Sequence, residues 1–184
     1  MPASGGRFFR CRRNARELQN MKILFICHGN ICRSPMAEFV MKDLAEKQGL
    51  LGCFEIESAA TSHEEIMRDY FNGVDRGNPV YPPARKKLAE HGIDCSGKTA
   101  RQVTRVDYDR FDMLVCMDSK NVRNLQRIIG SDPEGKVSLL LDHCGRAGQS
   151  VADPWYTGDF DAAWDDILEG CTALLEKCKT SLSR

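Results

Sequence analysis

The chain has 184 residues, of which 42% are hydrophobic and 28% charged, values that are ordinary for a single soluble globular domain. The formal net charge is zero, so no overall field favours nucleic acid or a membrane surface as a partner. No apolar run approaches the roughly 20 residues that span a bilayer, which argues against an integral membrane protein. Nine scattered cysteines without an apolar leader predict free thiols in a reducing, cytoplasmic compartment.

Residues 1–20 differ in composition from the rest of the chain. They hold five arginines and one glutamate, hence a charge of +4 (five minus one), and they show no apolar period. We expect a disordered extension here, with an Arg-rich targeting arm as the alternative. Residues 21–184 carry the compensating charge of −4 and are predicted to form a single domain.

The first predicted strand and the first predicted helix are joined by a short loop. The continuous apolar run at 22–27 has the length of a strand that is covered on both faces. Ser34 and Pro35 are typical of a helix start, with Ser34 as the N-cap and Pro35 in the first turn. The helix itself is predicted from an apolar stripe with four-residue spacing, formed by Met36, Val40 and Leu44.

Strands and helices continue to alternate along the rest of the chain. Further strands are predicted at 54–60, 112–117 and 137–141, and helices are predicted to begin at Pro82 and, with Ser119 as the cap, after the third strand. A last helix is predicted from the spacing of Phe160, Trp164, Ile167, Cys171, Leu174 and Cys178. This order predicts an α/β fold of three layers, α/β/α, with a four-stranded parallel sheet, doubly wound and Rossmann-like. Such sheets bind ligands beyond the carboxyl ends of their strands, where the loop after the first strand lies.

The segment from Cys27 to Ser34 indicates phosphate chemistry. A cysteine, five residues and an arginine can wrap around a dianion with inward backbone N–H groups, assisted by the N-terminus of the following helix. Arg33 would add a planar, two-pronged donor that matches phosphate oxygens. Cys27 would lie below the phosphorus as a thiolate nucleophile and form a phosphocysteine. The alternative is a buried strand-end cysteine and a surface arginine.

The other residues of this segment fit the same interpretation. Gly29 and Asn30 tolerate the positive φ that a tight anion-binding loop requires, and Ser34 has a hydroxyl that can donate to the Cys27 sulfur. Cys32 is either a partner for a reversible disulfide with Cys27 or a packed thiol. The predicted phosphate-binding residues besides Cys27 and Arg33 are His28, Gly29, Asn30, Ile31, Cys32 and Ser34.

Asp153 is the best candidate for the general acid. It lies in an Asp-Pro segment, which predicts a loop between the fourth strand and the last helix. Its carboxyl group can protonate the leaving phenolate and then take a proton from the water that hydrolyses the phosphocysteine. Trp155 and Tyr156 follow directly and are predicted to flank an aromatic leaving group. The alternative is a turn-forming aspartate, which is common before proline.

The segment CHGNICRSPMAE after KILFI, together with DPW near the C-terminus, resembles the low-molecular-weight protein tyrosine phosphatases over residues 21 to about 179. The resemblance implies a single phosphatase domain with a four-stranded parallel sheet and flanking helices, without a metal or an organic cofactor. It implies that Cys27 is the nucleophile, Arg33 the phosphate binder and Asp153 the general acid.

The same resemblance assigns supporting positions. Asn30, Ser34 and Ser58 match positions that shape the loop by hydrogen bonding. Asp118 matches an acidic position of the family, and the alternative is a carboxylate that is favoured at a helix start by the helix dipole.

The chain departs from the family pattern at three single positions. His28 stands where the residue is often apolar or threonine, so its titration near neutral pH is expected to affect the mouth of the site. Lys98 stands where many members have a histidine that supports the loop, which puts that hydrogen-bond network in doubt. Glu64 or its neighbour falls where an aromatic wall often stands, so stacking on an aromatic substrate is expected to be weaker.

The largest departure is an insertion between 66 and 77. It is expected to bring Tyr70 and Phe71 close to the substrate pocket, where they either replace the missing wall or pack the insertion down, with packing favoured.

The predicted function is hydrolysis of phosphotyrosine-type phosphomonoesters by a monomeric or weakly dimeric protein tyrosine phosphatase. Its expected substrate is a phosphotyrosine protein or a small aryl phosphate. Phosphoarginine hydrolysis is less favoured because bulky Ile31 stands where the phosphoarginine relative has threonine. Arsenate reduction is less favoured because Pro35 follows Ser34 and because Cys95 has no cysteine nearby in sequence. A non-catalytic phosphate-binding module would not need both Cys27 and Asp153.

Overall fold

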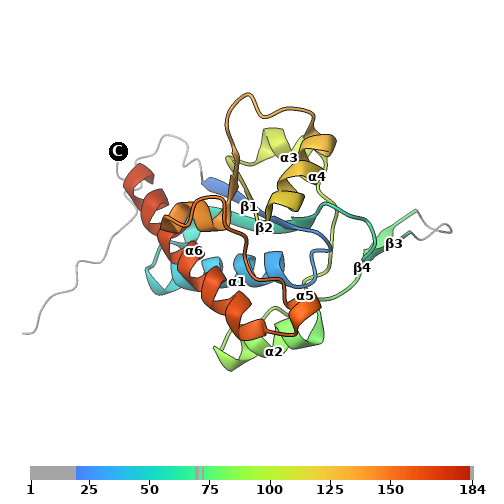
Figure 1. Cartoon of the computed structure of the whole chain (residues 1–184), viewed down its shortest axis with the longest axis horizontal. Coiled ribbons are helices and arrows are strands. Elements are labelled where there is room, and N and C mark those ends of the chain that lie inside the picture. The colour runs from blue at the N-terminus through green and yellow to red at the C-terminus, as the bar shows by residue number, and fades with distance from the viewer. Residues whose placement is uncertain (1–19, 69–70, 72, 183–184) are drawn as a thin grey trace, which may run out of the picture.

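The computed structural model describes residues 20–68, 71 and 73–182, so nearly all of the predicted N-terminal extension lies outside the described residues. Its centre is a parallel sheet of four strands in the order β2-β1-β5-β6 (Figure 1). The strands are β1 (Met21–Cys27), β2 (Phe54–Ala60), β5 (Met113–Cys116) and β6 (Val137–Leu139). The predicted four-stranded parallel α/β fold is therefore confirmed.

Helices cover both faces of the sheet, as the alternation of side chains along β1 requires. Ile23 and Phe25 point into a core with α1 (Arg33–Lys47), α2 (Pro82–Glu90) and α6 (Phe160–Leu182). Leu24 and Ile26 point the other way, into a core with α3 (Arg105–Arg110) and α4 (Ser119–Ile129). All four side chains are fully buried, which explains why the sequence of β1 is continuously apolar. Within the described parts of the chain, no helix is both long enough and apolar enough to cross a membrane.

Two helices begin at different residues from those predicted. α1 begins at Arg33 with Cys32 as its N-cap and no side-chain cap, because the Ser34 hydroxyl is bonded to the Cys27 sulfur instead. α4 is capped by Asp118 rather than Ser119, since the Asp118 carboxylate accepts from the backbone N–H of Asn121 at 2.7 Å.

Short elements fill the connections between the main strands and helices. The predicted fourth strand ends at Leu139 because a 3₁₀ turn, η2 (Leu140–Cys144), follows it. The sequence reading missed α3, although Thr104 and Asp107 form a capping box at its start. The remaining short elements are η1 (Leu51–Cys53) and α5 (Pro154–Thr157).

The predicted insertion forms an antiparallel hairpin of β3 (Ile66–Arg68) and β4 (Asp75–Gly77). The hairpin projects from the body of the protein on the side opposite the C-terminus (Figure 1). Gly77 lies at its base, where a Cβ would overlap the backbone carbonyl of Ala100, so only glycine fits there. The hairpin is thus anchored at its base.

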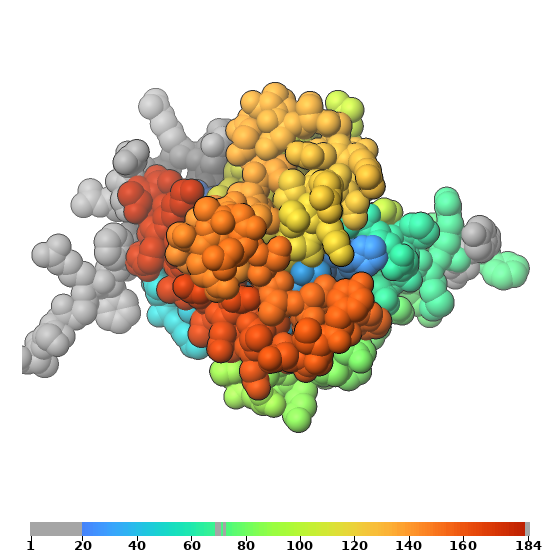
Figure 2. Space-filling view, in the orientation of Figure 1, coloured from blue at the N-terminus to red at the C-terminus, as the bar shows by residue number. Residues whose placement is uncertain are grey.

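β1 lies at the switch point of the sheet. Its chain leads to α1 on one face, whereas its neighbour β5 leads to α4 on the other face, so the two connections diverge beyond the strand ends. In the space-filling view, the blue segment that follows β1 is visible in a hollow between the yellow α4, the orange-red α5 and the teal side of the hairpin (Figure 2). The fold thereby exposes the loop after β1 at the predicted ligand-binding edge.

Candidate active site

The loop between β1 and α1 wraps around the Cys27 sulfur. Cys27 is the last residue of β1 and is buried, and the backbone N–H of Asn30 points at its Sγ at 3.3 Å. Asn30 has a φ of 58°, the left-handed conformation that the sequence predicted for this loop. The N-terminus of α1 follows at Arg33 and directs its positive dipole end at the same place. One backbone N–H and the N-terminus of α1 therefore face the sulfur, and the full ring of inward N–H groups stays a prediction.

A chain of hydrogen bonds orients the Ser34 hydroxyl toward the Cys27 sulfur. The backbone N–H of Arg101 donates to Asn30 Oδ1 at 3.1 Å, which fixes the orientation of the Asn30 amide. Asn30 Nδ2 then donates to Ser34 Oγ at 2.9 Å and to Ser58 Oγ at 2.8 Å. Because Ser34 Oγ accepts this bond, its own proton is available for Cys27 Sγ, 2.9 Å away. The hydroxyl can therefore donate to the Cys27 sulfur.

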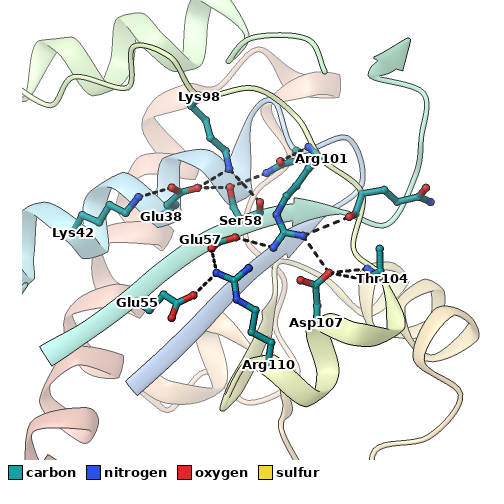
Figure 3. A network of polar contacts seen from close by, with 12 residues as sticks. Glu38, Lys42, Glu55, Glu57, Ser58, Lys98, Arg101, Thr104, Asp107 and Arg110 are labelled. Atoms are coloured by element: carbon teal, nitrogen blue, oxygen red, sulfur yellow. Dashed lines mark hydrogen bonds and ion pairs between the residues drawn. The ribbon is translucent and has the colours of Figure 1, made fainter. Parts of the chain in front are cut away.

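The other end of this chain is a buried ion cluster on α1. The Ser58 hydroxyl donates to Glu38 Oε2 at 2.5 Å, and the carboxylate of Glu38 also pairs with Lys98 at 2.9 Å and Lys42 at 2.5 Å (Figure 3). Burial raises the pKa of Glu38, but the charge of Lys98 and the hydrogen bonds from Lys42 and Ser58 outweigh it, so the pKa lies below its ordinary value. Lys98 also donates to the Ser58 carbonyl at 3.1 Å. The hydrogen-bond network that supports the loop, which was in doubt because lysine stands at position 98, is therefore intact. Lys98 takes part in it through Glu38 and the Ser58 carbonyl.

A second ion cluster holds the backbone that orients Asn30. The Arg101 guanidinium pairs with Glu57 at 2.9 Å and with Asp107 at 3.1 Å, and Arg110 bridges Glu55 and Glu57 (Figure 3). These pairs fix the segment whose N–H reaches Asn30. The loop is therefore held by groups on β2 and α3 as well as by its own residues.

Arg33 lies between two carboxylates. Its guanidinium pairs with Asp118 at 2.8 Å and with Asp153 at 2.8 Å, and its side chain is almost fully buried. Burial lowers the pKa of Arg33, but the charges of Cys27, Asp153 and Asp118 outweigh this effect and raise it. Asp118 thus fulfils both readings of the sequence, because it caps α4 and orients Arg33. Asp153 is the N-cap of α5 and lies directly at the guanidinium.

A cavity of about 170 Å³ opens above the sulfur. Trp155 and Tyr156 form one wall and are 55% and 83% exposed, while Glu64 and Glu65 lie on another. His28 also lines the cavity, and its Nε2 is 2.9 Å from a carboxylate oxygen of Glu64. The lining of the cavity therefore combines the Cys27 thiol with an aromatic wall and an acidic wall.

The prediction for the insertion was wrong for Phe71. Its side chain is 103% exposed on the projecting hairpin, so it is not buried, and it is not among the residues that line the cavity. The physical reason is that residues 66–68 and 75–77 pair with each other, which carries Phe71 away from the body. Tyr70 lies outside the described residues.

Cys32 is a packed thiol. It is buried beside Ile31 and Ala100. Burial, and then the nearby charges of Cys27 and Asp153, raise its pKa to about 12. At neutral pH Cys32 is therefore protonated. Cys27 and Cys32 are both free thiols in this structure, and a reversible disulfide between them stays a prediction.

The sequence profile of the family described as low molecular weight phosphotyrosine protein phosphatase matches residues 22–184. The chain belongs to this family. The low molecular weight protein-tyrosine-phosphatase YfkJ of Bacillus subtilis is 37% identical over 156 residues, which are 84% of this chain and 94% of YfkJ. The human low molecular weight phosphotyrosine protein phosphatase is 34% identical over 165 residues, 88% of this chain and 98% of the human protein.

Solved structures agree with this assignment. The crystal structure of YfkJ matches with a TM-score of 0.79 and 36% identity, covering 88% of this chain and 96% of YfkJ. The crystal structure of SP-PTP from Streptococcus pyogenes, a low molecular weight protein tyrosine phosphatase, matches with a TM-score of 0.71 and 35% identity. The match covers 85% of this chain and 92% of SP-PTP. The predicted family and the predicted enzyme class, a protein tyrosine phosphatase, are confirmed.

Sequence reasoning missed the residues that support the loop from a distance. Glu38 was not singled out, although a carboxylate four residues after Ser34, on the buried side of α1, is an unusual position that signals a partner. The roles of Lys98 and Arg101 have no such signal, because their partners are 60 and 44 residues away, at Glu38 and Glu57. Glu65 on the acidic wall was also missed.

Proposed function

We propose that Cys27, Arg33 and Asp153 carry the phosphotyrosine hydrolysis of this phosphatase, through a phosphocysteine intermediate. The observation that supports this most directly is their convergence: all three line one cavity, with the Cys27 sulfur at its floor. The proposal extends to residues 21–184 as a single phosphatase domain that acts in the cytoplasm as a monomer or weak homodimer. The substrate is a phosphotyrosine protein or a small aryl phosphate.

Binding begins with an exchange of anions at Arg33. In the structure its guanidinium pairs with Asp118 and Asp153. An entering phosphate dianion competes for the two-pronged face of the guanidinium, and the loop N–H groups bind the remaining oxygens. Asp118 keeps Arg33 in place during this exchange, because it is fixed as the cap of α4. The exchange releases Asp153 toward the ester oxygen.

The first chemical step transfers the phosphoryl group to sulfur. The Cys27 thiolate attacks the phosphorus in line, so a sulfur–phosphorus bond forms while the phosphorus–oxygen bond to the aryl group breaks. Asp153, in its protonated form, gives its proton to the leaving phenolate oxygen. Ser34 lowers the energy of the thiolate at the start and at the end of the cycle.

The second step regenerates the enzyme. A water molecule attacks the phosphocysteine, and the Asp153 carboxylate takes its proton. The sulfur–phosphorus bond breaks, inorganic phosphate forms, and its departure allows Arg33 to pair with Asp153 again. Arg33 and the loop N–H groups stabilise the charge on the equatorial oxygens in both steps.

The aromatic wall favours an aryl ester over an alkyl ester. Trp155 and Tyr156 line the cavity, and buried Ile31 adds an apolar surface beside the loop. The acidic wall of Glu64 and Glu65 disfavours a second negative charge close to the phosphate.

Turnover of p-nitrophenyl phosphate by wild type and by Cys27→Ser tests the proposal. We expect turnover that vanishes in the variant, and a phosphorylated Cys27 that rapid acid quenching and mass spectrometry detect in wild type. Tight phosphate binding without turnover would instead support a binding module. Faster hydrolysis of phosphoarginine peptides than of phosphotyrosine peptides would indicate that the substrate carries its phosphoryl group on arginine nitrogen instead of tyrosine oxygen.

A further inference from the structure

A second, larger groove adjoins the catalytic cavity. We propose that it binds the peptide segment that flanks the phosphotyrosine of a protein substrate, and that Arg85 and Lys86 select an acidic residue in that segment. This inference rests on the proposed function, since it concerns how the same site chooses its protein substrates.

The groove has a volume of about 550 Å³ and is mostly apolar at its floor. Ile31, Val80 and Tyr81 contribute to the floor, Pro79 lines it from the connection between β4 and α2, and Pro82 lines it from the start of α2. Arg85 and Lys86, on the first turns of α2, form the far rim. Its size lies within the range of ligand-binding clefts, and it is open enough to admit an extended chain.

The groove is continuous with the catalytic cavity. Ile31 and Glu65 line both of them and form the ridge between them. The backbone N–H of Tyr81 donates to the Ile31 carbonyl at 2.9 Å, and the Tyr81 ring contacts Trp155 of the aromatic wall with 5.3 Å between ring centroids. A chain that leaves a bound phosphotyrosine on this side therefore passes directly over the ridge into the groove.

The charges of the groove define what it binds. Arg85 is exposed and forms no ion pair with a described residue, and Lys86 has only a distant partner, Glu90 at 4.0 Å. Two cations on an apolar rim attract a carboxylate that is carried by an otherwise apolar segment. Glu65 keeps its negative charge, but it lies at the ridge, where Asn78 Nδ2 donates to it at 2.8 Å, and it forms no ion pair with Arg85 or Lys86.

The position of the cations relative to the acidic wall predicts a charge pattern. Glu64 and Glu65 stand next to the phosphate site, whereas Arg85 and Lys86 stand beyond the ridge. An acidic side chain is therefore favoured some residues away from the phosphotyrosine, on one side only, and is unfavourable beside it.

The test compares phosphotyrosine peptides that carry one glutamate at each position from four residues before to four residues after the phosphotyrosine. For wild type, kcat/KM should peak at positions on one side and at least two residues away. In Arg85→Glu/Lys86→Glu, the ratio of kcat/KM on the best peptide to that on p-nitrophenyl phosphate should fall about 5–30-fold. The same variant should prefer the peptide in which lysine replaces the glutamate, a reversal that damage to the fold would not produce.

Lys177→Glu is the control for charge reversal, because it exchanges one lysine for glutamate on α6, about 24 Å along that helix from Asp161, which contacts α2 through Lys87. It should leave all ratios unchanged. The proposed role of the groove would be refuted if kcat/KM of wild type did not depend on the position of the glutamate. It would also be refuted if the double variant lost kcat/KM equally on peptides and on p-nitrophenyl phosphate. Absence of turnover on p-nitrophenyl phosphate in wild type would refute the proposed function instead, so the two failures are distinguishable.

Discussion

Replacing Lys98 by methionine should destabilise the protein through Glu38. The substitution keeps the length of the side chain and removes its charge, which leaves a carboxylate with a 5% exposed side chain without its Coulombic partner at 2.9 Å. Lys98 is itself only 13% exposed, so little solvent screens the pair. Because the site is buried, the substitution breaks a buried ion pair and does not merely remove a surface contact.

The expected loss follows from what remains around Glu38. Removal of one partner from a buried ion pair costs about 3–5 kcal/mol when the other charge is left unpaired. Here Lys42, whose side chain is 34% exposed, still contacts the carboxylate at 2.5 Å, so the charge of Glu38 keeps one partner. We therefore expect a loss of about 2–3 kcal/mol in the free energy of unfolding.

Urea denaturation at pH 7, followed by circular dichroism, measures this loss. Lys87→Met is the matched control, since Lys87 pairs with the exposed carboxylate of Asp161 and should change the stability much less. In a double-mutant cycle, Glu38→Gln combined with Lys98→Met should cost less than the sum of the two single changes, by at least about 1 kcal/mol.

The pH dependence gives an independent check with a defined sign. The folded pKa of Glu38 lies below its ordinary value of 4.5, so the stabilisation from its ionisation is complete above that value and is lost as the pH falls through the folded pKa. The stability difference between wild type and Lys98→Met should therefore narrow in acid. A loss below about 0.5 kcal/mol at pH 7, equal to that of the control, would refute the reasoning.

Three further predictions concern the loop and the general acid. Asp153→Asn should lower kcat/KM for phenyl phosphate by about 10²–10⁴-fold, and kcat/KM for p-nitrophenyl phosphate less, because its leaving group needs less protonation; equal losses of kcat/KM on both esters would assign the proton transfer elsewhere. Asn30→Ala should be less stable than Asn30→Gly by about 1 kcal/mol in thermal unfolding, because both lose the amide but only alanine is strained at a φ of 58°. Cys32, with its pKa raised to about 12, should resist iodoacetamide at pH 8 in the folded protein, as mass spectrometric mapping of the label would report; rapid labelling there would contradict its burial.

Much of the fold was predictable because its signals are local. The apolar run of β1 is fully buried on both faces, and the spacing of Phe160, Trp164 and Ile167 matches α6. The starts of helices were predicted less well. Ser34 and Ser119 are good caps by residue type, but Ser34 bonds to the Cys27 sulfur and Asp118 precedes Ser119 with a better acceptor.

What the sequence by itself determined is the loop around Cys27, because Cys27, Asn30 and Arg33 lie within one short segment whose geometry depends on local backbone conformation. Only the tertiary structure decided what holds that loop. Lys98 meets Glu38 across 60 residues, and Phe71 is carried away from the cavity by the pairing of β3 with β4. Such contacts depend on where the sheet brings distant segments together, so they cannot be predicted from the residues next to each position in the sequence.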